Sequence, residues 1–554
     1  MRKSFKILSV IFAAVLILSC VPFSASAAYG KWVGSWSTSP VETCVEIKGN
    51  KFSDILIDST VRIFLQPTIS GKSVRFKFSN LYGDKPLIIK SACVARADTS
   101  KGDKSAVLPE TAVGLRFSGG IECVVPPGKS EYSDPVSFSV KALESIAVSY
   151  YVEDGILMKT GGLVGAESFM CLGKHINDAS LGIAAPLSLE VSGLRMNTVP
   201  FLTNMDVYAA DDAYSIAIIG DSTVCNDIPQ LLAERLVESG VENIGVLQQA
   251  IKGNRLLYEG VGFLGNLYGE SVMDRFYRDA INQTGVKKIF VKIGLNDILH
   301  PRTASMEGKA PYASVEEIIA GYEKLCELAH QGGKEIYFFT KTPWKGYTRE
   351  ILFSSSPDLI WSQEAEDMCN RLNDWILSNS LADGYIDLAA LHDELDPSVF
   401  PEGYSVDGVH LTEKAQIKLV DLIPEKLFDL GERHIKTLEA IIAERLAHSD
   451  DSSQKPGETQ TGTAQIIQPV TDIGSGADKT DTVKNTQTST SADIRTEATA
   501  SSNTEALSEQ TTLPDEKTDS ERSRRGVIYA GVLSAVLLIV VAVIIAFSKK
   551  KKTV

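Results

Sequence analysis

Four short polar segments of the sequence contain residue types suited to acyl transfer. A serine hydroxyl becomes a strong nucleophile only when a base removes its proton, and histidine can be that base near neutral pH. A carboxylate that hydrogen-bonds the histidine ring holds it in the required tautomer. Ser222, His410 and Asp407, three residues before that histidine, form the candidate catalytic set. The segments are Gly220-Asp221-Ser222, 251–256, 294–297 and 405–411.

The same segments contain candidate donors for an oxyanion hole. The negative oxygen of a tetrahedral intermediate needs hydrogen-bond donors already in place, and the loss of one costs roughly 3–4 kcal/mol. The backbone N–H groups of Ser222 and Gly253 and the side-chain amide of Asn296 are the candidates. This chemistry requires neither a metal nor a cofactor, and the eight cysteines show no zinc-type spacing. We therefore expect no metal and no cofactor.

Each of these residues also has a simpler interpretation. Ser222 alone could merely cap a following helix. His300, which lies soon after Asn296, is the rival base, and we expect it at the surface or at the rim of a pocket. Asp221 and Asp297 flank the candidate site and are expected to brace loops. His434 and His448 lie in a terminal helical pattern and are expected to be solvated.

Residues 213–448 alternate between strand-like and helix-like segments. This alternation predicts an α/β fold with a parallel sheet covered on both faces, and ligands of such sheets lie beyond the carboxyl ends of the strands. The four polar segments should therefore meet at one edge. The predicted strands are 215–220, 287–293, 335–339 and 384–388, and the predicted helices are 229–238, 315–330 and 364–378.

Residues 28–212 have a different pattern, in which short apolar and polar alternations are separated by turn signals. This pattern predicts an all-β accessory domain, an antiparallel sandwich or jelly roll. Trp32 and Trp36 at its start are expected in the core, with glycan contact as the alternative. The predicted strands are 60–65, 73–78, 136–140 and 145–152.

The two ends of the chain predict export and a membrane anchor. Residues 1–27 combine a basic start, an apolar run and Ala25-Ser26-Ala27, as in a secretory signal peptide; lipidation at Cys20 is the alternative. Residues 449–525 are expected to form a disordered stalk, since 451–520 contain 24 Ser or Thr and no aromatic residue. Residues 526–547 are uncharged and, as a helix, span about 33 Å, enough to cross a bilayer.

The lysine-rich tail, 548–554, is expected in the cytoplasm under the positive-inside rule. The sequence thus predicts a single-pass protein of the cell membrane with an extracellular catalytic domain. A net charge of −15 argues against a nucleic-acid partner, which would require a basic face. Seven cysteines remain after removal of Cys20, and disulfides and isolated buried thiols are equally compatible with their spacing.

The four segments resemble the SGNH subclass of the GDSL esterase and lipase family. Ser222, Gly253, Asn296 and His410 match its four blocks, and Asp407 matches its acid. The stretches 32–36, 250–257 and 274–279 are similar to a bacterial subgroup with an N-terminal β-sandwich. The resemblance covers roughly residues 30–430 and implies a flavodoxin-like hydrolase domain with these residues in their family roles. The sequence departs from the family at Thr223–Asn226 and at Lys252. Either departure could narrow the pocket or alter the substrate preference without removing the chemistry.

The sequence therefore predicts an extracellular serine esterase that removes acyl groups, acetyl above all, through an acyl-Ser222 intermediate. Its expected partners are an acylated polysaccharide or a small ester, and the membrane. Two alternatives stay open. One is a lipase or lysophospholipase-type acylhydrolase, and the other is a surface glycan-binding protein that uses a hydrolase scaffold without catalysis.

Overall fold

The computed structural model describes residues 30–47, 50–100, 102–191, 194–225, 227–262, 264–303, 308–349 and 358–452. The predicted signal peptide, the membrane segment 526–547, the tail 548–554 and nearly all of the predicted stalk lie outside these residues. Helix α9 (Leu438–Ser452) continues into the first residues assigned to the stalk. Within the described ranges, no helix has the length and apolar character needed to cross a membrane.

The N-terminal region is built from two antiparallel sheets. The first has the order β1 (Gly30–Ser37), β21 (Leu202–Ala210), β7 (Val74–Ser79) and β12 (Ser130–Tyr132). The second has the order β10 (Val107–Gly114), β9 (Ser91–Ala97), β13 (Ile146–Val152), β6 (Ser59–Leu65), β16 (Glu167–Leu172) and β17 (Ala185–Pro186). Short ladders complete the N-terminal region. In one of them β15 (Thr160–Gly162) lies between β2 (Val41–Glu42) and β20 (Val199–Pro200). The others are the pairs β3 (Val45–Ile47) with β4 (Asn50–Phe52), β5 (Ile55–Leu56) with β14 (Ile156–Leu157), β8 (Leu87–Ile89) with β11 (Cys123–Val125), and β18 (Ser188–Val191) with β19 (Leu194–Asn197).

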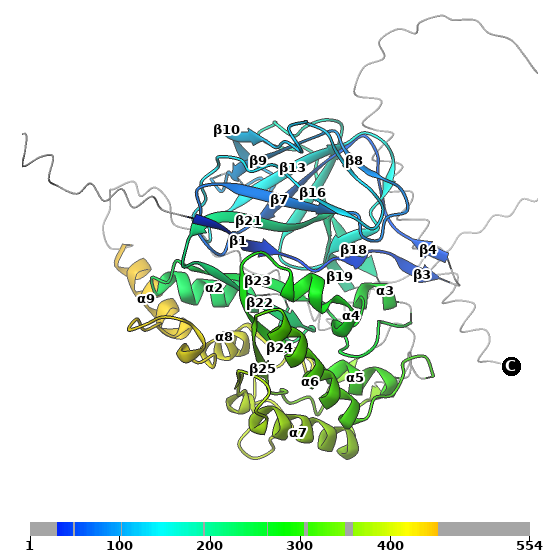
Figure 1. Cartoon of the computed structure of the whole chain (residues 1–554), viewed down its shortest axis with the longest axis vertical. Coiled ribbons are helices and arrows are strands. Elements are labelled where there is room, and N and C mark those ends of the chain that lie inside the picture. Colours follow the sequence, from blue (N-terminus) through cyan, green and yellow to red (C-terminus); the bar gives the residue numbers. More distant parts are fainter. Residues whose placement is uncertain are drawn as a thin grey trace, which may run out of the picture. The chain divides into compact units, whose positions relative to one another are not determined.

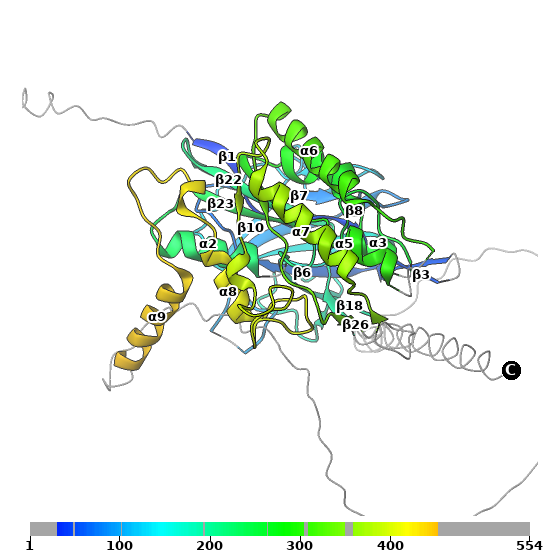
Figure 2. The same ribbon diagram turned by 90° about the horizontal axis from the view of Figure 1, so that it is seen from below.

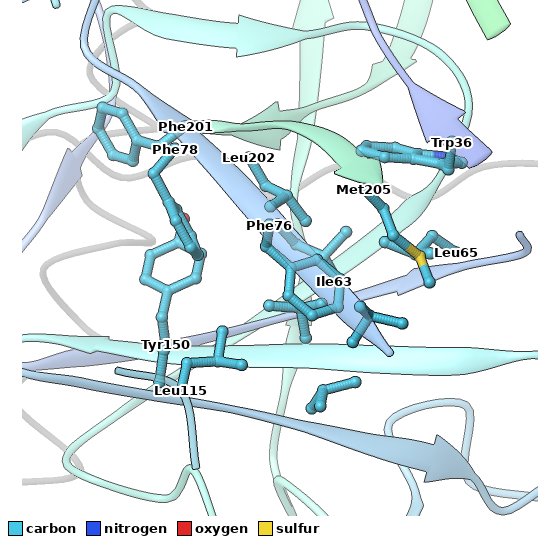
Figure 3. Close-up of a cluster of buried hydrophobic side chains, with 14 of the residues drawn as sticks. Trp36, Ile63, Leu65, Phe76, Phe78, Leu115, Tyr150, Phe201, Leu202 and Met205 are labelled. Atoms are coloured by element: carbon cyan, nitrogen blue, oxygen red, sulfur yellow. The ribbon is translucent and has the colours of Figure 1, made fainter. Parts of the chain in front are cut away.

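Apolar side chains from the two sheets share one core, so the N-terminal region is a β-sandwich. Successive strand residues face opposite sides, and Phe76 and Phe78 of β7 meet Ile63 and Tyr150 of the second sheet (Figure 3). The rings of Phe78 and Tyr150 pack edge to face, 5.6 Å between centroids. The predicted β-rich architecture is thus confirmed.

One predicted strand is wrong. Residues 136–140 form no continuous strand, and only two isolated bridges occur, Val74 to Val136 and Gly71 to Val140. Apolar and polar residues alternate in this stretch, but the residues between Val136 and Val140 pair with no strand of the described chain.

The second region contains an all-parallel sheet, as predicted, and this sheet has five strands. Its order is β23 (Ile244–Ala250), β22 (Tyr214–Gly220), β24 (Val286–Lys292), β25 (Glu335–Phe339) and β28 (Gly384–Ile386). Ile216 and Ile218 face a core shared with α2 (Ile228–Glu238) and α8 (Glu413–Asp421). Ala217 and Ile219 face the opposite core, shared with α6 (Val315–Gln331) and α7 (Gln363–Ser378). Figure 2 shows these two pairs of helices on opposite sides of the sheet.

Three of the long helices begin directly after a serine or threonine that caps them. Ser314, Ser362 and Thr412 precede α6, α7 and α8, and the hydroxyl of each accepts a backbone N–H of the first turn. The remaining helical segments are short: α3 (Gly265–Tyr268), α4 (Val272–Phe276), the π-helical η1 (Tyr277–Ile281), α5 (Leu295–Leu299), and the 3-10 turns η2 (His300–Arg302), η3 (Ala389–Leu391) and η4 (Glu425–Leu427). A two-stranded ribbon, β26 (Thr348–Arg349) with β27 (Asp358–Leu359), also occurs.

The sandwich covers the edge strand β23 of the parallel sheet (Figure 1). Thr68 bonds both backbone groups of Val246, at 2.9 Å and 3.1 Å. The Ser37 hydroxyl donates to the Gln248 carbonyl at 3.2 Å. An uncovered edge strand would leave these backbone groups to pair with another chain. The described parts of both regions form one compact unit, and their separation into two domains near residue 212 stays a prediction.

Candidate active site

Three of the predicted site residues follow three adjacent strands. Ser222 lies two residues after β22, Gly253 three after β23 and Asn296 four after β24. At the end of β22, Gly220 pairs with Ala250 of β23 and with Lys292 of β24. Because parallel strands end at a common edge, the three segments meet there.

A tight loop before α8 holds the histidine and the aspartate. The Ser405 hydroxyl donates to the His410 carbonyl at 2.9 Å and accepts the Gly408 N–H at 2.9 Å. Gly408 has a φ of +93°, and a side chain there would lie 2.7 Å from the Tyr347 nitrogen. The loop therefore requires glycine and has little freedom to rearrange.

The side chains of Ser222, His410 and Asp407 form a continuous hydrogen-bonded chain. His410 Nε2 lies 2.9 Å from Ser222 Oγ, and His410 Nδ1 lies 2.7 Å from Asp407 Oδ2. Asp407 Oδ1 also accepts the backbone N–H groups of Val409 and His410 at 3.1 Å and 2.8 Å. Burial acts to raise the pKa of Asp407, but the hydrogen bonds and charge of His410 outweigh it, so this pKa is lowered. The carboxylate is thus ionised at neutral pH.

Hydrogen bonds of Asn254 and Asn296 hold the segment that contains Gly253. Gly253 has a φ of +74°, and its neighbour Asn254 donates to the carbonyls of Tyr268 and Glu270 at 2.7 Å and 2.8 Å. The Asn296 amide donates one proton to the Asn254 carbonyl at 2.9 Å, which leaves its second proton for another acceptor. Within the described ranges, neither the Ser222 N–H nor the Gly253 N–H donates to another group of the chain.

The two neighbouring aspartates brace loops, as predicted. Asp221 Oδ1 accepts the backbone N–H and the hydroxyl of Thr223 at 2.9 Å and 2.6 Å. Asp297 accepts the N–H groups of Leu256 and Leu257 at 2.7 Å and 3.1 Å. Thr223, a departure from the family pattern, therefore has a defined structural role in this chain.

The placement predicted for His300 is wrong. Helix α5 continues directly into η2, and this continuation directs the ring inward, where it is 3% exposed and lies 5.2 Å from the Tyr268 ring. His434 is exposed as expected, but it lies before α9 and not within a helix. Of the aromatic pair, Trp36 is in the core, whereas Trp32 is half-buried and stacks on Arg75.

Sequence reasoning missed two lysines buried beneath the site. The Lys292 ammonium donates to Thr223 Oγ1 at 2.8 Å, and the Lys341 ammonium donates to the Ile293 carbonyl. Burial lowers the pKa of Lys292 to about 8, partly opposed by Asp221. Burial, and then repulsion from Lys292, lowers the pKa of Lys341 to about 7. The signal available in the sequence was the position of Lys292 at the end of a buried strand.

The described ranges contain seven cysteines but no cluster of metal ligands. The seven cysteines found there are all free and buried, so isolated thiols replace the disulfide alternative. No three His, Cys, Asp or Glu side chains of the described residues gather in a way that could hold a metal ion.

Comparison with known proteins gives the class of this site. Residues 216–423 match the family model described as GDSL-like Lipase/Acylhydrolase. This part of the chain therefore belongs to the GDSL acylhydrolases, which are enzymes acting on ester bonds. The matched residues include Ser222, Gly253, Asn296, Asp407 and His410.

Two solved structures illustrate the wider likeness. A GDSL-like lipase from Bacteroides thetaiotaomicron is 14% identical, with 42% of this chain and 88% of that chain covered and a TM-score of 0.26. A variant of an acetyl xylan esterase from Geobacillus stearothermophilus is 17% identical, with 38% of this chain and 92% of that chain covered and a TM-score of 0.29. A comparison with curated proteins finds no match.

Replacing Gly253 by alanine is expected to lower kcat by about 100-fold or more. A Cβ at this position would lie 2.2 Å from Tyr268 Cδ1, so the segment must shift and displace its N–H. Ester hydrolysis by the purified full chain measures the effect. Gly240→Ala is the matched control, since Gly240 has a similar φ of +77° but no atom within 4 Å. Equal losses in both variants would contradict this explanation.

The buried lysines predict a stability that rises with pH. Between about pH 7 and the ordinary lysine pKa of about 10.4, the unfolded chain holds a proton on Lys341 that the folded chain lacks, so the free energy of unfolding increases. Lys341→Met should flatten this rise between about pH 7 and about pH 8.5, as measured by urea unfolding. The exposed Lys324→Met is the control, and an unchanged slope in Lys341→Met would refute the prediction.

Proposed function

We propose that the chain hydrolyses acyl esters through a covalent acyl-Ser222 intermediate, with His410 as base and acid and Asp407 as its orienting carboxylate. The observation that carries the proposal is the unbroken chain from Ser222 Oγ through both ring nitrogens of His410 to Asp407, with separations of 2.9 Å and 2.7 Å. Both lie within the range required for proton transfer and for tautomer control.

The first half of the reaction forms the acyl-enzyme. Ser222 Oγ attacks the carbonyl carbon while its proton passes to His410 Nε2, and the carbonyl electron pair moves onto the oxygen. The N–H groups of Ser222 and Gly253 and the free amide proton of Asn296 stabilise that oxyanion. The bond to the leaving alcohol then breaks, and His410 returns the proton to the alcohol.

The second half releases the acid. Water takes the place of the alcohol, gives a proton to His410 Nε2 and attacks the acyl carbon. Collapse of the second tetrahedral intermediate breaks the bond to Ser222 Oγ, which recovers the proton. The negative charge of Asp407 stabilises the imidazolium formed in each half.

For the substrate we propose short acyl esters, acetyl above all, carried on carbohydrate. The Tyr268 ring occupies the space directly beside Gly253, and this crowding supports a small acyl group. The predicted placement outside the cell supports an exposed, acylated polysaccharide over an intracellular lipid. A long-chain lipase or lysophospholipase activity is the alternative that the substrate assay below separates.

For the location we propose a single-pass membrane protein exported by residues 1–27 and anchored by residues 526–547, with the enzyme outside. The support comes from the sequence: an apolar signal at one end, and at the other an uncharged stretch followed by lysines.

Ser222→Ala and His410→Ala are each expected to lower kcat by at least about 1,000-fold, because each removes a participant in both halves of the reaction. Nitrophenol release from nitrophenyl acetate by the full chain measures this loss. His434→Ala is the matched control, since its side chain is 87% exposed and lies in another part of the chain.

Wild-type turnover by Ser222→Ala would refute the proposed mechanism. The same purified enzyme distinguishes the substrates: acetate released from acetylated polysaccharide, together with much slower cleavage of a decanoyl ester, is the expected result. Preferred cleavage of the decanoyl ester or of lysophospholipid would favour the lipase alternative. Glycan binding without turnover of any ester would favour the non-catalytic alternative.

Truncation of the chain after residue 452 is expected to release active enzyme into the medium, whereas the full chain should remain in the membrane fraction. The reason is loss of the predicted anchor, while every described residue is retained. Cell fractionation with an ester assay on each fraction measures the outcome. Retention of the truncated chain in the membrane would contradict a C-terminal anchor and point to Cys20.

A further inference from the structure

Arg275 in α4 is a fully buried arginine beneath the active site, within the stretch 274–279. Arginine is seldom buried unless its donors are paired. Its guanidinium donates to Asn254 Oδ1 from Nε and Nη2 (3.1 Å and 2.9 Å), to the Gln249 carbonyl (2.7 Å), to Ser39 Oγ (3.1 Å), to Asp279 Oδ2 (3.1 Å) and to the Gly220 carbonyl (3.4 Å).

Two of these acceptors belong to the segments that present the reacting groups. Gly220 is the last residue of β22, two positions before Ser222. Asn254 follows Gly253, and its own carbonyl accepts the Asn296 amide at 2.9 Å. One guanidinium therefore bonds the strand end that carries the nucleophile and the turn that carries the oxyanion donors.

The charge of Arg275 is balanced within the same cluster. Asp279 Oδ2 lies 3.1 Å from Arg275, and Arg278 approaches the same carboxylate at 2.7 Å and 3.0 Å. Burial acts to raise the pKa of Asp279, but Arg278 and Arg275 outweigh it, so the pKa is lowered and the carboxylate stays ionised.

The sandwich supplies the last partner of this cluster. Ser39 lies two residues after the end of β1, with its Oγ 2.6 Å from Gln249 Oε1 and 3.1 Å from Asp279 Oδ2. Gln249 in turn donates to Ser37 Oγ at 2.8 Å. All of these side chains are at most 3% exposed, so the cluster is shielded from bulk solvent.

We infer that Arg275 is a positioning residue for the hydrolysis reaction, and that Ser39 extends this function to the β-sandwich. Arg275 fixes the distance between the Ser222 turn and the Gly253 turn, and the sandwich completes the hydrogen bonds that fix Arg275. The inference rests on the proposed role of Ser222. On this inference, the β-sandwich helps to position the catalytic segments and is required for full activity.

The hydrogen bonds of the cluster depend on the planar shape of the Arg275 guanidinium. It presents five donors in fixed directions, whereas a lysine ammonium at the same place keeps the charge but reaches fewer acceptors. Arg275→Lys therefore leaves Asp279 paired while it frees Asn254 and Gly220. A misplacement of about 1 Å between reacting groups can cost about 100-fold in rate.

The first test is Arg275→Lys in the full chain. We expect kcat for nitrophenyl acetate to fall about 100-fold with KM changed less than about 2-fold. The rate at which a fluorophosphonate labels Ser222 should fall in parallel, because labelling needs the same attack geometry. Thermal unfolding of each variant is recorded, and assays are run well below the lowest Tm.

The second test keeps the inference falsifiable if Arg275→Lys does not fold. Ser39→Ala should lower kcat about 5-fold, as expected for one lost hydrogen bond to the cluster. Ser35→Ala is the matched control: Ser35 is equally buried in β1, and its hydroxyl bonds Ile69 and makes no contact with Arg275. Its kcat should stay within about 2-fold of wild type.

Two outcomes would overturn the inference. One is a folded Arg275→Lys with wild-type kcat and labelling rate. The other is an equal loss of kcat in Ser39→Ala and Ser35→Ala. Ser222→Ala is assayed beside them, because full turnover by that variant would remove the proposed function itself, a result distinguishable from failure of the positioning role alone.

Discussion

The separation of 2.9 Å between His410 Nε2 and Ser222 Oγ is the constraint on which the rest of the structure depends. The two residues are 188 positions apart in the chain and follow different elements. A hydroxyl and an imidazole held at this distance need rigid supports on both sides. The parallel sheet supplies one, through the strand end at Gly220, and the loop closed by Ser405 and Gly408 supplies the other.

The supports of the site are mostly buried polar groups, and each is paired. Asp221 and Asp297 accept backbone N–H groups of the catalytic segments, and Asn254 donates to the carbonyls of Tyr268 and Glu270. Arg275 reaches two of those segments, at Gly220 and at Asn254. Buried polar groups are costly when unpaired and rigid when paired, so such a network specifies one arrangement. The β-sandwich takes part in this network, because its hydroxyl groups hydrogen-bond backbone groups of the edge strand β23.

Much of this could be read from the sequence. Hydrophobic periodicity located four of the five parallel strands, β22, β24, β25 and β28, and the helices α2, α6 and α7. The motif spacing selected the residues that the structure brings together at the sheet edge. Periodicity failed at 136–140, where alternation exists without a partner strand. It also could not place His300, Lys292 or Arg275, because their burial depends on contacts between distant segments, which no local pattern encodes.

The central claim is that Ser222 carries the acyl group during turnover. The most direct measurement is rapid acid quench of the full chain with an excess of nitrophenyl acetate, followed by mass spectrometry of the peptide that contains Ser222. We predict an added acetyl group on Ser222 in the wild type and none on that peptide in Ser222→Ala. An active wild-type enzyme with acetyl on another side chain, or turnover retained in Ser222→Ala, would contradict the account.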